Sequence, residues 1–319
     1  MEIHNYAVND INLCVHQTGP EHGRPVWLLH GFPECWHSWR YQAPALAAAG
    51  YRVHVPEMRG YGRSDAPRDP AAYDLLTLCG DIRAAMDHLG QREAAVVGHD
   101  WGAPVAWHTA LLEPERVKAV AAMSVPFGGR PKASPLSYMR KLFENRFHYI
   151  LYFQRPGVAE AELEADIRRS LRLIFHNWSG AVPGGSFLRE KPADARLLDG
   201  AAEPDGWPTW MSETDFEEYV KTFEGHGFHG ALNWYRNFDR NWELTAPLDG
   251  RRIEQPALFL VGDKDPVRLL EAKTLERMPT LVPKVEQHVL QDCGHWTQVE
   301  QAEAVNTHLL GFLRRHYPA

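Results

Sequence analysis

The pentapeptide GHDWG at residues 98–102 places an aspartate, Asp100, where a strand is expected to turn sharply into a helix. An apolar run at 94–97 precedes it, and a helix-prone segment at 103–112 follows. The flanking glycines permit a strained turn and close helix–strand contact, so the central side chain is presented at a helix N-terminus, as in a nucleophile elbow. Taken alone, the pentapeptide fits equally well an Asp N-cap that merely opens a helix. The neighbouring motifs have to decide between these interpretations.

An aspartate at such a turn indicates a particular kind of reaction. A carboxylate is already ionised at neutral pH, whereas a serine hydroxyl needs a base, and attack by the carboxylate forms an ester. This chemistry suits an electrophilic sp³ carbon, as in an epoxide or an alkyl halide, better than an ester or amide carbonyl. We therefore expect Asp100 to form a covalent ester with such a substrate.

Two further motifs are placed to complete the site. HGFPE at 30–34 directly follows the apolar run at 26–29, so this loop can aim a backbone N–H at the same point as the N–H of Trp101 and form an oxyanion hole. DCGHW at 292–296 follows the last predicted strand, which puts His295 where a general base belongs in chain order. An ordinary Gly-Pro turn and a surface histidine are the alternative interpretations of these two motifs.

The segment GDKDP at 262–266 offers an acid to orient His295. It follows the predicted strand at 257–261 and contains two aspartates. We prefer Asp265 as the orienting acid. Asp263 remains a rival, although it can instead serve as a turn residue.

The elements that must position these residues are those of an α/β protein. Short apolar runs read as buried strands of a mostly parallel sheet: 26–29, 52–55, 94–97, 117–124, 257–261 and 285–290. Helical segments alternate with them, which predicts a doubly wound sheet with ligands at the carboxyl ends of the strands. Helix signals replace the strands in the middle of the chain. We therefore predict a core of residues 1–127 and 250–319, with residues 128–249 inserted as a helical cap.

Local signals also predict some helix ends within the cap. Thr214 with Glu217 forms a capping-box pattern ahead of an apolar helical face. Gly225 is placed to end that helix. After the cap the chain returns to the sheet, and an amphipathic pattern predicts a C-terminal helix.

Composition excludes several classes of protein. With 319 residues and 44% hydrophobic side chains, the chain can bury a large core. Its net charge of −7 provides no basic footprint for nucleic acid or anionic membranes. We expect no membrane span and no signal peptide, because no apolar stretch is long enough and the N-terminus lacks the basic and apolar regions of a leader. The four cysteines are scattered and there is no HExxH, so we expect free thiols in a reducing cytoplasm and neither metal nor cofactor.

Together these motifs resemble those of the epoxide hydrolases of the α/β-hydrolase fold, and the chain is especially similar to the hydrolase domain of mammalian soluble epoxide hydrolases. The matching stretches span nearly the whole chain: HGFPE at 30–34, GHDWG at 98–102, FHYILYFQRPGVAEAELE at 147–164, NWYRNFDRNW at 233–242 and DCGHWTQ at 292–298. The two stretches in the predicted cap are far more specific than the elbow. The second, phosphatase-type domain of the mammalian proteins is not expected in a chain of this length.

The resemblance implies roles for two cap tyrosines. In that family two tyrosines donate hydrogen bonds to the epoxide oxygen, and they match Tyr149 and Tyr235 of this chain. A tyrosine hydroxyl stays protonated at pH 7 and can give its proton to the alkoxide that develops as the ring opens. Without the resemblance, packing in a helical core is the better interpretation of both rings.

The mechanism that the resemblance implies has two steps. Asp100 attacks one ring carbon while the tyrosines hold the epoxide oxygen. His295, oriented by Asp265, then takes a proton from water. The resulting hydroxide attacks the ester carbonyl, whose oxyanion is held by the N–H groups of Phe32 and Trp101.

Glu34, the last residue of HGFPE, is a further candidate, for ordering the attacking water. The expected partners are a small-molecule epoxide and water, and no nucleic acid. A monomer and a cap-mediated homodimer are both compatible with the sequence.

Haloalkane dehalogenases are the nearest alternative, since they also place Trp after an Asp nucleophile. They bind the departing halide through N–H donors, commonly Trp and an Asn that follows His-Gly in the early loop, where this chain has Phe32. A halide needs no proton donor, so a tyrosine pair would be idle. Fluoroacetate dehalogenases place an arginine at the position of Trp101. A hydrolase-fold protein that has lost catalysis and binds a ligand is the third alternative, against which the intact Asp100, Asp265 and His295 argue.

Overall fold

One eight-stranded sheet runs through the protein in the order β1-β2-β4-β3-β5-β6-β7-β8. The computed structural model describes residues 1–186 and 189–319. The strands are β1 (Glu2–Val8), β2 (Ile11–Thr18), β3 (Pro25–Leu29), β4 (Arg52–Pro56), β5 (Ala94–His99), β6 (Val117–Met123), β7 (Ala257–Gly262) and β8 (Val285–Leu290). Strands β3 to β8 pair in parallel, whereas β1 and β2 pair antiparallel. The α/β class and the mostly parallel sheet predicted from the sequence are confirmed.

The first two strands form a hairpin that the strand prediction missed. Its turn residues Asn9 and Asp10 both have left-handed backbone, with φ of 45° and 64°. Two-residue hairpin turns require this conformation, and Asn and Asp tolerate it better than most residues. β2 then pairs antiparallel with β4, so the hairpin closes one edge of the sheet.

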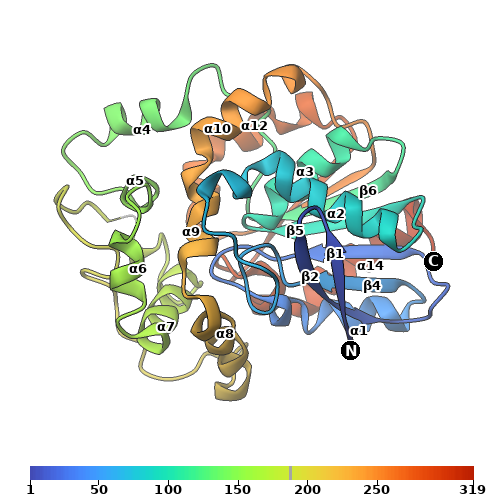
Figure 1. Ribbon diagram of the computed structural model, residues 1–319, viewed down its shortest axis with the longest axis horizontal. Coiled ribbons are helices and arrows are strands. Elements are labelled where there is room, and N and C mark those ends of the chain that lie inside the picture. Colours follow the sequence, from blue (N-terminus) through green and yellow to red (C-terminus); the bar gives the residue numbers. More distant parts are fainter. Residues whose placement is uncertain (187–188) are drawn as a thin grey trace.

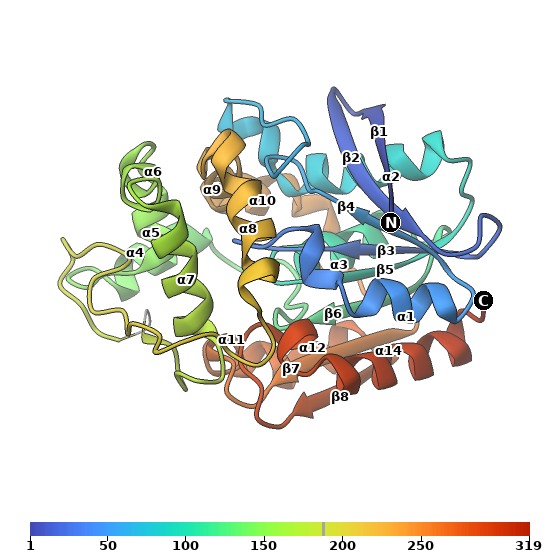
Figure 2. The same cartoon turned by 90° about the horizontal axis from the view of Figure 1, so that it is seen from below.

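Helices cover both faces of the sheet (Figures 1 and 2). α1 and α14 lie on one face, and α2 and α3 lie on the other. The core helices are α1 (Gln42–Ala48), α2 (Leu75–His88), α3 (Gly102–Leu112), α11 (Pro266–Leu270), α12 (Ala272–Leu281), α13 (Thr297–Glu300) and α14 (Ala302–His316). Because both faces are covered, the central strand β5 is buried along its whole length.

The segment between β6 and β7 carries further helices: α4 (Pro135–Leu142), α5 (Tyr149–Phe153), α6 (Val158–Leu163), α7 (Ile167–Trp178), α8 (Glu213–His226), α9 (His229–Arg236) and α10 (Phe238–Leu244). We call these the inserted helices. Figure 2 shows α5 to α8 beyond the ends toward which the parallel strands point. Side chains from this segment can therefore face the loops that follow the strands.

The predicted ends of α8 were each wrong by two residues. Ser212 is the N-cap and forms the capping box with Asp215, two positions before the predicted Thr214 and Glu217. The helix ends at Gly227, whose φ is 67°, and not at Gly225. Both patterns offer a hydroxyl followed three residues later by an acid, so the sequence alone does not separate them.

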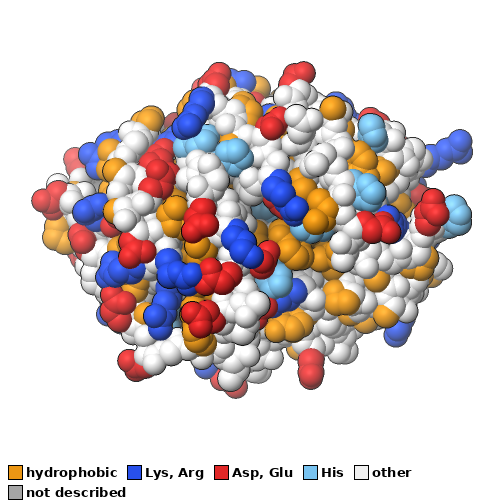
Figure 3. Space-filling model, turned by 60° about the horizontal axis from the view of Figure 1, so that its bottom comes forward, with side chains coloured by type: hydrophobic (Ala, Val, Ile, Leu, Met, Phe, Trp, Pro, Cys, Tyr) orange, Lys and Arg blue, Asp and Glu red, His pale blue; other side chains and the backbone are white. Residues whose placement is uncertain are grey.

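The visible surface carries charges of both signs, and the described helices do not have the length and apolar character of a membrane span. On the face shown in Figure 3, acidic and basic side chains lie interspersed. The segment between β6 and β7 carries ion pairs such as Arg168 with Glu217 and Arg169 with Glu203, which is ordinary for a solvated surface. Within the described residues, every helix is too short or too polar to cross a membrane.

The strand order explains where the loops meet. The chain leaves β3 toward β4 on one side and leaves β5 toward β6 on the other, although β3 and β5 are neighbours. Such a reversal opens a crevice outside the carboxyl ends of the two strands. The loop after β3 and the turn after β5 both border this crevice.

Candidate active site

Asp100 lies in the crevice because the sharp turn between β5 and α3 directs its side chain there. Its φ is +49°, a left-handed conformation that costs a non-glycine residue free energy. A Cβ atom on Gly98 would lie 2.0 Å from the carbonyl oxygen of Gly102, and one on Gly102 would lie 2.1 Å from that of Leu29. Only glycine fits at both positions, so the structure has the elbow that GHDWG predicted.

The loop after β3 contacts the carboxylate of Asp100 directly. The N–H of Phe32 donates to Oδ1 of Asp100 at 2.7 Å. A Cβ atom on Gly31 would lie 2.5 Å from Cβ of Asp100 and 2.6 Å from the nitrogen of Trp101, so the loop can approach only because residue 31 is glycine. The N–H of Trp101, the second expected donor, lies beside the same loop at the start of α3.

His295 lies between two carboxylates. Its Nε2 is 3.4 Å from Oδ2 of Asp100, and its Nδ1 is 3.2 Å from Oδ1 of Asp265. His295 and Asp265 are both buried. Although burial favours the neutral ring, Asp265 and Asp100 raise the pKa of His295 to about 10. Before substrate arrives, the imidazole is therefore protonated at neutral pH.

The two candidate acids after β7 have different surroundings. Asp265 points at His295 and also caps α11 by accepting from the N–H of Val267 at 2.9 Å. Asp263 accepts from the N–H of Cys293 at 3.0 Å, which is a contact within the turn and not to the imidazole. The geometry therefore favours Asp265 as the orienting acid.

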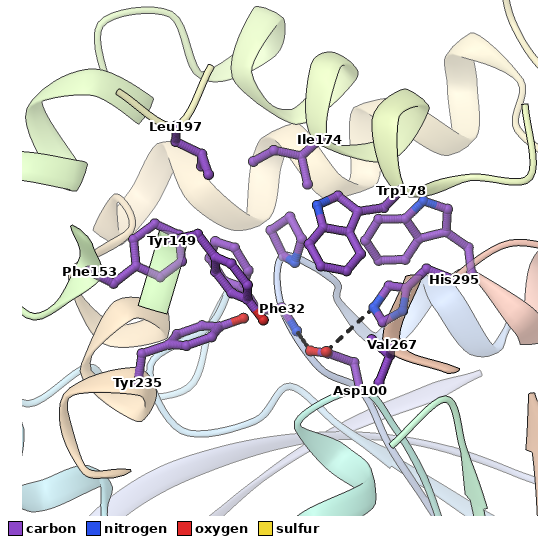
Figure 4. Close-up of a pocket in the computed structure, with 12 residues that line it drawn as sticks. Phe32, Asp100, Tyr149, Phe153, Ile174, Trp178, Leu197, Tyr235, Val267 and His295 are labelled. Carbon is purple, nitrogen blue, oxygen red and sulfur yellow. Dashed lines mark hydrogen bonds and ion pairs between the residues drawn. The ribbon is translucent and has the colours of Figure 1, made fainter. Parts of the chain in front are cut away.

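Tyr149 and Tyr235 face Asp100 from the inserted helices. Figure 4 shows both hydroxyl groups pointing into the same space above the Asp100 carboxylate. The rings lie edge to face with their centres 6.0 Å apart. Burial, and after it the charge of Asp100, raises the pKa of both tyrosines above the usual value. Both hydroxyls are thus protonated and able to donate at neutral pH.

The pocket around these groups is otherwise apolar. It is lined by Phe32, Pro33, Asp100, Tyr149, Phe153, Ile174, Trp178, Leu197, Tyr235, Val267, His295 and Trp296. It encloses about 40 Å³, room for only a few water molecules.

Glu34 does not line this pocket. Its Oε2 accepts from the N–H of Gly31 at 2.9 Å and lies 2.6 Å from Nδ1 of His99, while its Oε1 accepts from Nε2 of Gln298 at 2.6 Å. Burial disfavours its charged form, but His99 and the hydrogen bonds lower the pKa of Glu34 to about 2. The structure thus places Glu34 behind the Phe32 loop, joined through Nε2 of His99 to the carbonyl oxygen of His295.

Sequence reasoning missed two residues around the imidazole. His99, inside the elbow motif, carries the link from Glu34 to the backbone of His295. Ser124 follows β6, and its Oγ is 2.9 Å from Nδ1 of His295. The sequence signal for Ser124 is its position at the carboxyl end of the predicted strand at 117–124.

Among the described residues, one group of possible metal ligands comes together, away from the pocket: Cys14, His16 and Glu57. Nη2 of Arg63 lies 2.5 Å from Oε1 of Glu57 and 2.7 Å from Nε2 of His16. A guanidinium therefore already provides the positive charge in this group. Burial also raises the pKa of the Cys14 thiol to about 12, so it is a poor metal ligand at neutral pH.

The chain is similar to known proteins over nearly its whole length. The family model of the alpha/beta hydrolase fold matches residues 24–302. Epoxide hydrolase A of Mycobacterium tuberculosis is 44% identical over 311 residues, covering 96% of this chain and 95% of that protein. Bifunctional epoxide hydrolase 2 of Sus scrofa is 39% identical over 311 residues, which are 97% of this chain but only 55% of that protein.

Solved structures are similar over the whole chain. The crystal structure of epoxide hydrolase A from Mycobacterium thermoresistibile has a TM-score of 0.92 and 42% identity, and covers 98% of both chains. Potato (Solanum tuberosum) epoxide hydrolase I has a TM-score of 0.88 and 34% identity, covering 98% of this chain and 99% of that one. The chain belongs to the epoxide hydrolases of the α/β-hydrolase fold.

Proposed function

We propose that this enzyme converts epoxides to vicinal diols through a covalent ester on Asp100. The observation that carries the proposal is the opposition of two tyrosine hydroxyls to one strained aspartate across an apolar pocket. The carboxylate nucleophile and the two proton donors lie on opposite sides of one small space. When an epoxide C–O bond breaks there, the carboxylate can attack the carbon while the donors hold the oxygen.

The first step forms the ester. An oxygen of Asp100 attacks one ring carbon, and the bond from that carbon to the epoxide oxygen breaks. Tyr149 and Tyr235 hold the developing alkoxide, and one of them supplies the proton that it needs. The apolar surroundings strengthen these hydrogen bonds, because little water competes for the charge.

The second step hydrolyses the ester. Nε2 of His295 takes a proton from water, and the hydroxide oxygen bonds to the ester carbonyl carbon. The N–H groups of Phe32 and Trp101 then hold the oxyanion. When the acyl C–O bond breaks, the electron pair of that bond and the proton of the added hydroxyl group go to the product oxygen. This leaves a diol, a carboxylate on Asp100 and an imidazole that keeps the proton taken from water.

The charge pattern around His295 supports a change of role between the steps. In the free enzyme the charges of Asp100 and Asp265 keep the imidazole protonated. Ester formation removes the charge of Asp100, so the pKa of His295 falls. The ring can then give its proton back to the tyrosine that protonated the alkoxide, and the neutral ring can act as the base, which is required only in the second step.

We further propose that the inserted helices, residues 128–249 in the sequence prediction, are a cap that selects the substrate. Phe153, Ile174, Trp178 and Leu197 line the pocket from this segment and are all apolar. An epoxide with apolar substituents, such as an aryl or fatty-acid epoxide, is therefore the expected class. The free, buried cysteines Cys14, Cys35, Cys79 and Cys293 support a cytoplasmic location for the enzyme.

The discriminating experiment offers the enzyme trans-stilbene oxide or an epoxy fatty acid beside a bromoalkane. Formation of diol without bromide release supports the proposal. Bromide release without diol would instead assign a haloalkane dehalogenase, and turnover of neither by folded protein would favour a ligand-binding function. The position of Phe32, where a dehalogenase needs a side-chain N–H donor, makes bromide release the less expected outcome.

A further inference from the structure

Ser124 has an unusual backbone for a buried serine. It follows β6 directly and is fully buried. Its φ is +70°, in the left-handed region that favours glycine. A strained non-glycine residue persists only where its surroundings hold it, and such residues cluster at functional sites. The strained backbone therefore indicates that the side chain of Ser124 has a role in the site.

The hydroxyl of Ser124 contacts the proposed catalytic histidine. Oγ of Ser124 lies 2.9 Å from Nδ1 of His295, closer than Oδ1 of Asp265 at 3.2 Å. The two groups reach the ring from adjacent strands, because β6 pairs with β7 and each residue lies just beyond its strand. Two oxygens from different directions thus converge on one ring nitrogen.

We propose that Ser124 is a positioning residue, which shares the Nδ1–H of His295 with Asp265 and so keeps Nε2 directed at Asp100. This inference rests on the proposed function, in which Nε2 must be the base of the second step. A single hydrogen bond to Asp265 leaves the ring free to pivot about that contact, whereas a second acceptor fixes its plane. Because a hydroxyl is neutral, Ser124 fixes the ring without adding a charge that would hold its proton.

The two steps of the reaction distinguish positioning from simple packing. Attack by Asp100 on the epoxide does not need His295 as a base, whereas hydrolysis of the ester does. Loss of the Ser124 hydroxyl should therefore slow hydrolysis and leave ester formation almost unchanged. A merely structural role would change both rates together, or neither.

The test measures both rates in single turnovers of trans-stilbene oxide for wild type, Ser124→Ala and Ser124→Gly. Both variants lose the hydroxyl, but glycine relieves the backbone strain, so a folding defect in the alanine variant does not prevent the test. Thr109→Val is the control, since it removes a buried hydroxyl that bonds to Val105 within α3. Unfolding curves of each protein report its stability.

We expect ester formation within about twofold of wild type and ester hydrolysis slowed about ten- to a hundredfold in both Ser124 variants, as for a lost hydrogen bond to a charged group. The control should change neither rate. Hydrolysis at the wild-type rate, or an equal loss in both steps, would overturn the role of Ser124. If wild type itself forms no ester, the proposed function fails, which is a different result from either.

Discussion

The rings of Tyr149 and Tyr235 lie edge to face, with an angle of 77° between them, although α5 and α9 are far apart in the chain. Figure 4 shows that the two hydroxyls nevertheless point into the same space opposite Asp100. A single epoxide oxygen at that position can accept from both donors. Each tyrosine should partly compensate for loss of the other.

Replacement of either tyrosine by phenylalanine tests this arrangement. Phenylalanine keeps the ring packing but removes the donor, and a lost hydrogen bond to developing charge costs about 1.5–3 kcal/mol, roughly ten- to a hundredfold in rate. Tyr149→Phe and Tyr235→Phe should each slow ester formation by that factor, and the double variant should be nearly inactive but folded. Stopped-flow fluorescence measures the rate. Tyr138→Phe, at a largely exposed tyrosine, is the control.

Near wild-type ester formation by the double variant would show that the two rings only pack. The choice between epoxide and halide would then lose its main support. The enzyme would remain an aspartate-nucleophile hydrolase of unassigned substrate.

Asparagine at each of the two acids after β7 tests which one orients the imidazole. Asp265→Asn removes the charge beside Nδ1 of His295 and should cut turnover by orders of magnitude, because the ring loses the partner that fixes its tautomer. Asp263→Asn should be mild, since that side chain only accepts from the turn. Steady-state kinetics of the two variants, which differ at neighbouring positions of one loop, provide the comparison. The opposite ranking would move the assignment to Asp263.

Alanine at Gly31 should disable the oxyanion hole, because the added Cβ atom would clash with the side chain of Asp100 and with the backbone nitrogen of Trp101. The added Cβ would lie within 2.6 Å of both Asp100 and the nitrogen of Trp101, so the loop must shift and carry the N–H of Phe32 away. Loss of one such donor typically costs about 10²–10³ in kcat. Gly206→Ala, where the Cβ meets nothing within 4 Å, should be neutral. Activity of Gly31→Ala equal to that of this control would argue against the oxyanion hole.

The pKa of His295 predicts how stability depends on pH. The pKa is raised to about 10 in the folded protein, whereas a histidine in an unfolded chain titrates near 6.5. The folded state thus holds the proton more tightly, and the protonated His295 contributes to the free energy of unfolding. This contribution is complete below about pH 6.5 and is lost as the pH rises through about 10. The difference in free energy of unfolding between wild type and His295→Gln should shrink across this window. Urea denaturation at several pH values measures it, and a difference that stays constant would contradict the raised pKa.

Features that a local sequence pattern determines were predicted better than contacts between loops that are far apart in the chain. The ends of the predicted strands agree with those of the observed β3 to β8 to within one or two residues. The reason for β3 to β7 is that buried parallel strands are continuous apolar runs. The expectation of a buried strand was wrong for β8, which lies at the edge of the sheet and is largely exposed or half-buried. The elbow could be predicted because its two glycines are part of the motif. At either glycine, a Cβ atom would lie less than 2.5 Å from a carbonyl oxygen. The cap tyrosines came from family resemblance, since an aromatic ring in a helix has no local sign of chemistry.

What the sequence did not predict has physical reasons as well. The hairpin of β1 and β2 has one exposed strand, so it lacks a continuous apolar run. Ser124 and the contacts of Glu34 depend on which strands are neighbours, and single-residue patterns carry no such information. The contacts of Glu34, the candidate for ordering the water, join it to His99, Gln298 and the Phe32 loop, which the sequence did not predict.

The covalent role of Asp100 is the central claim, and one turnover in ¹⁸O-water tests it most directly. Enzyme in excess over epoxide is quenched after a single turnover, and the diol and the Asp100 peptide are analysed by mass spectrometry. If Asp100 attacks the epoxide and water then attacks the ester carbonyl, the label enters the Asp100 carboxylate and the first diol is unlabelled. Label in the first diol, with none on Asp100, would contradict the covalent mechanism and indicate direct attack by water.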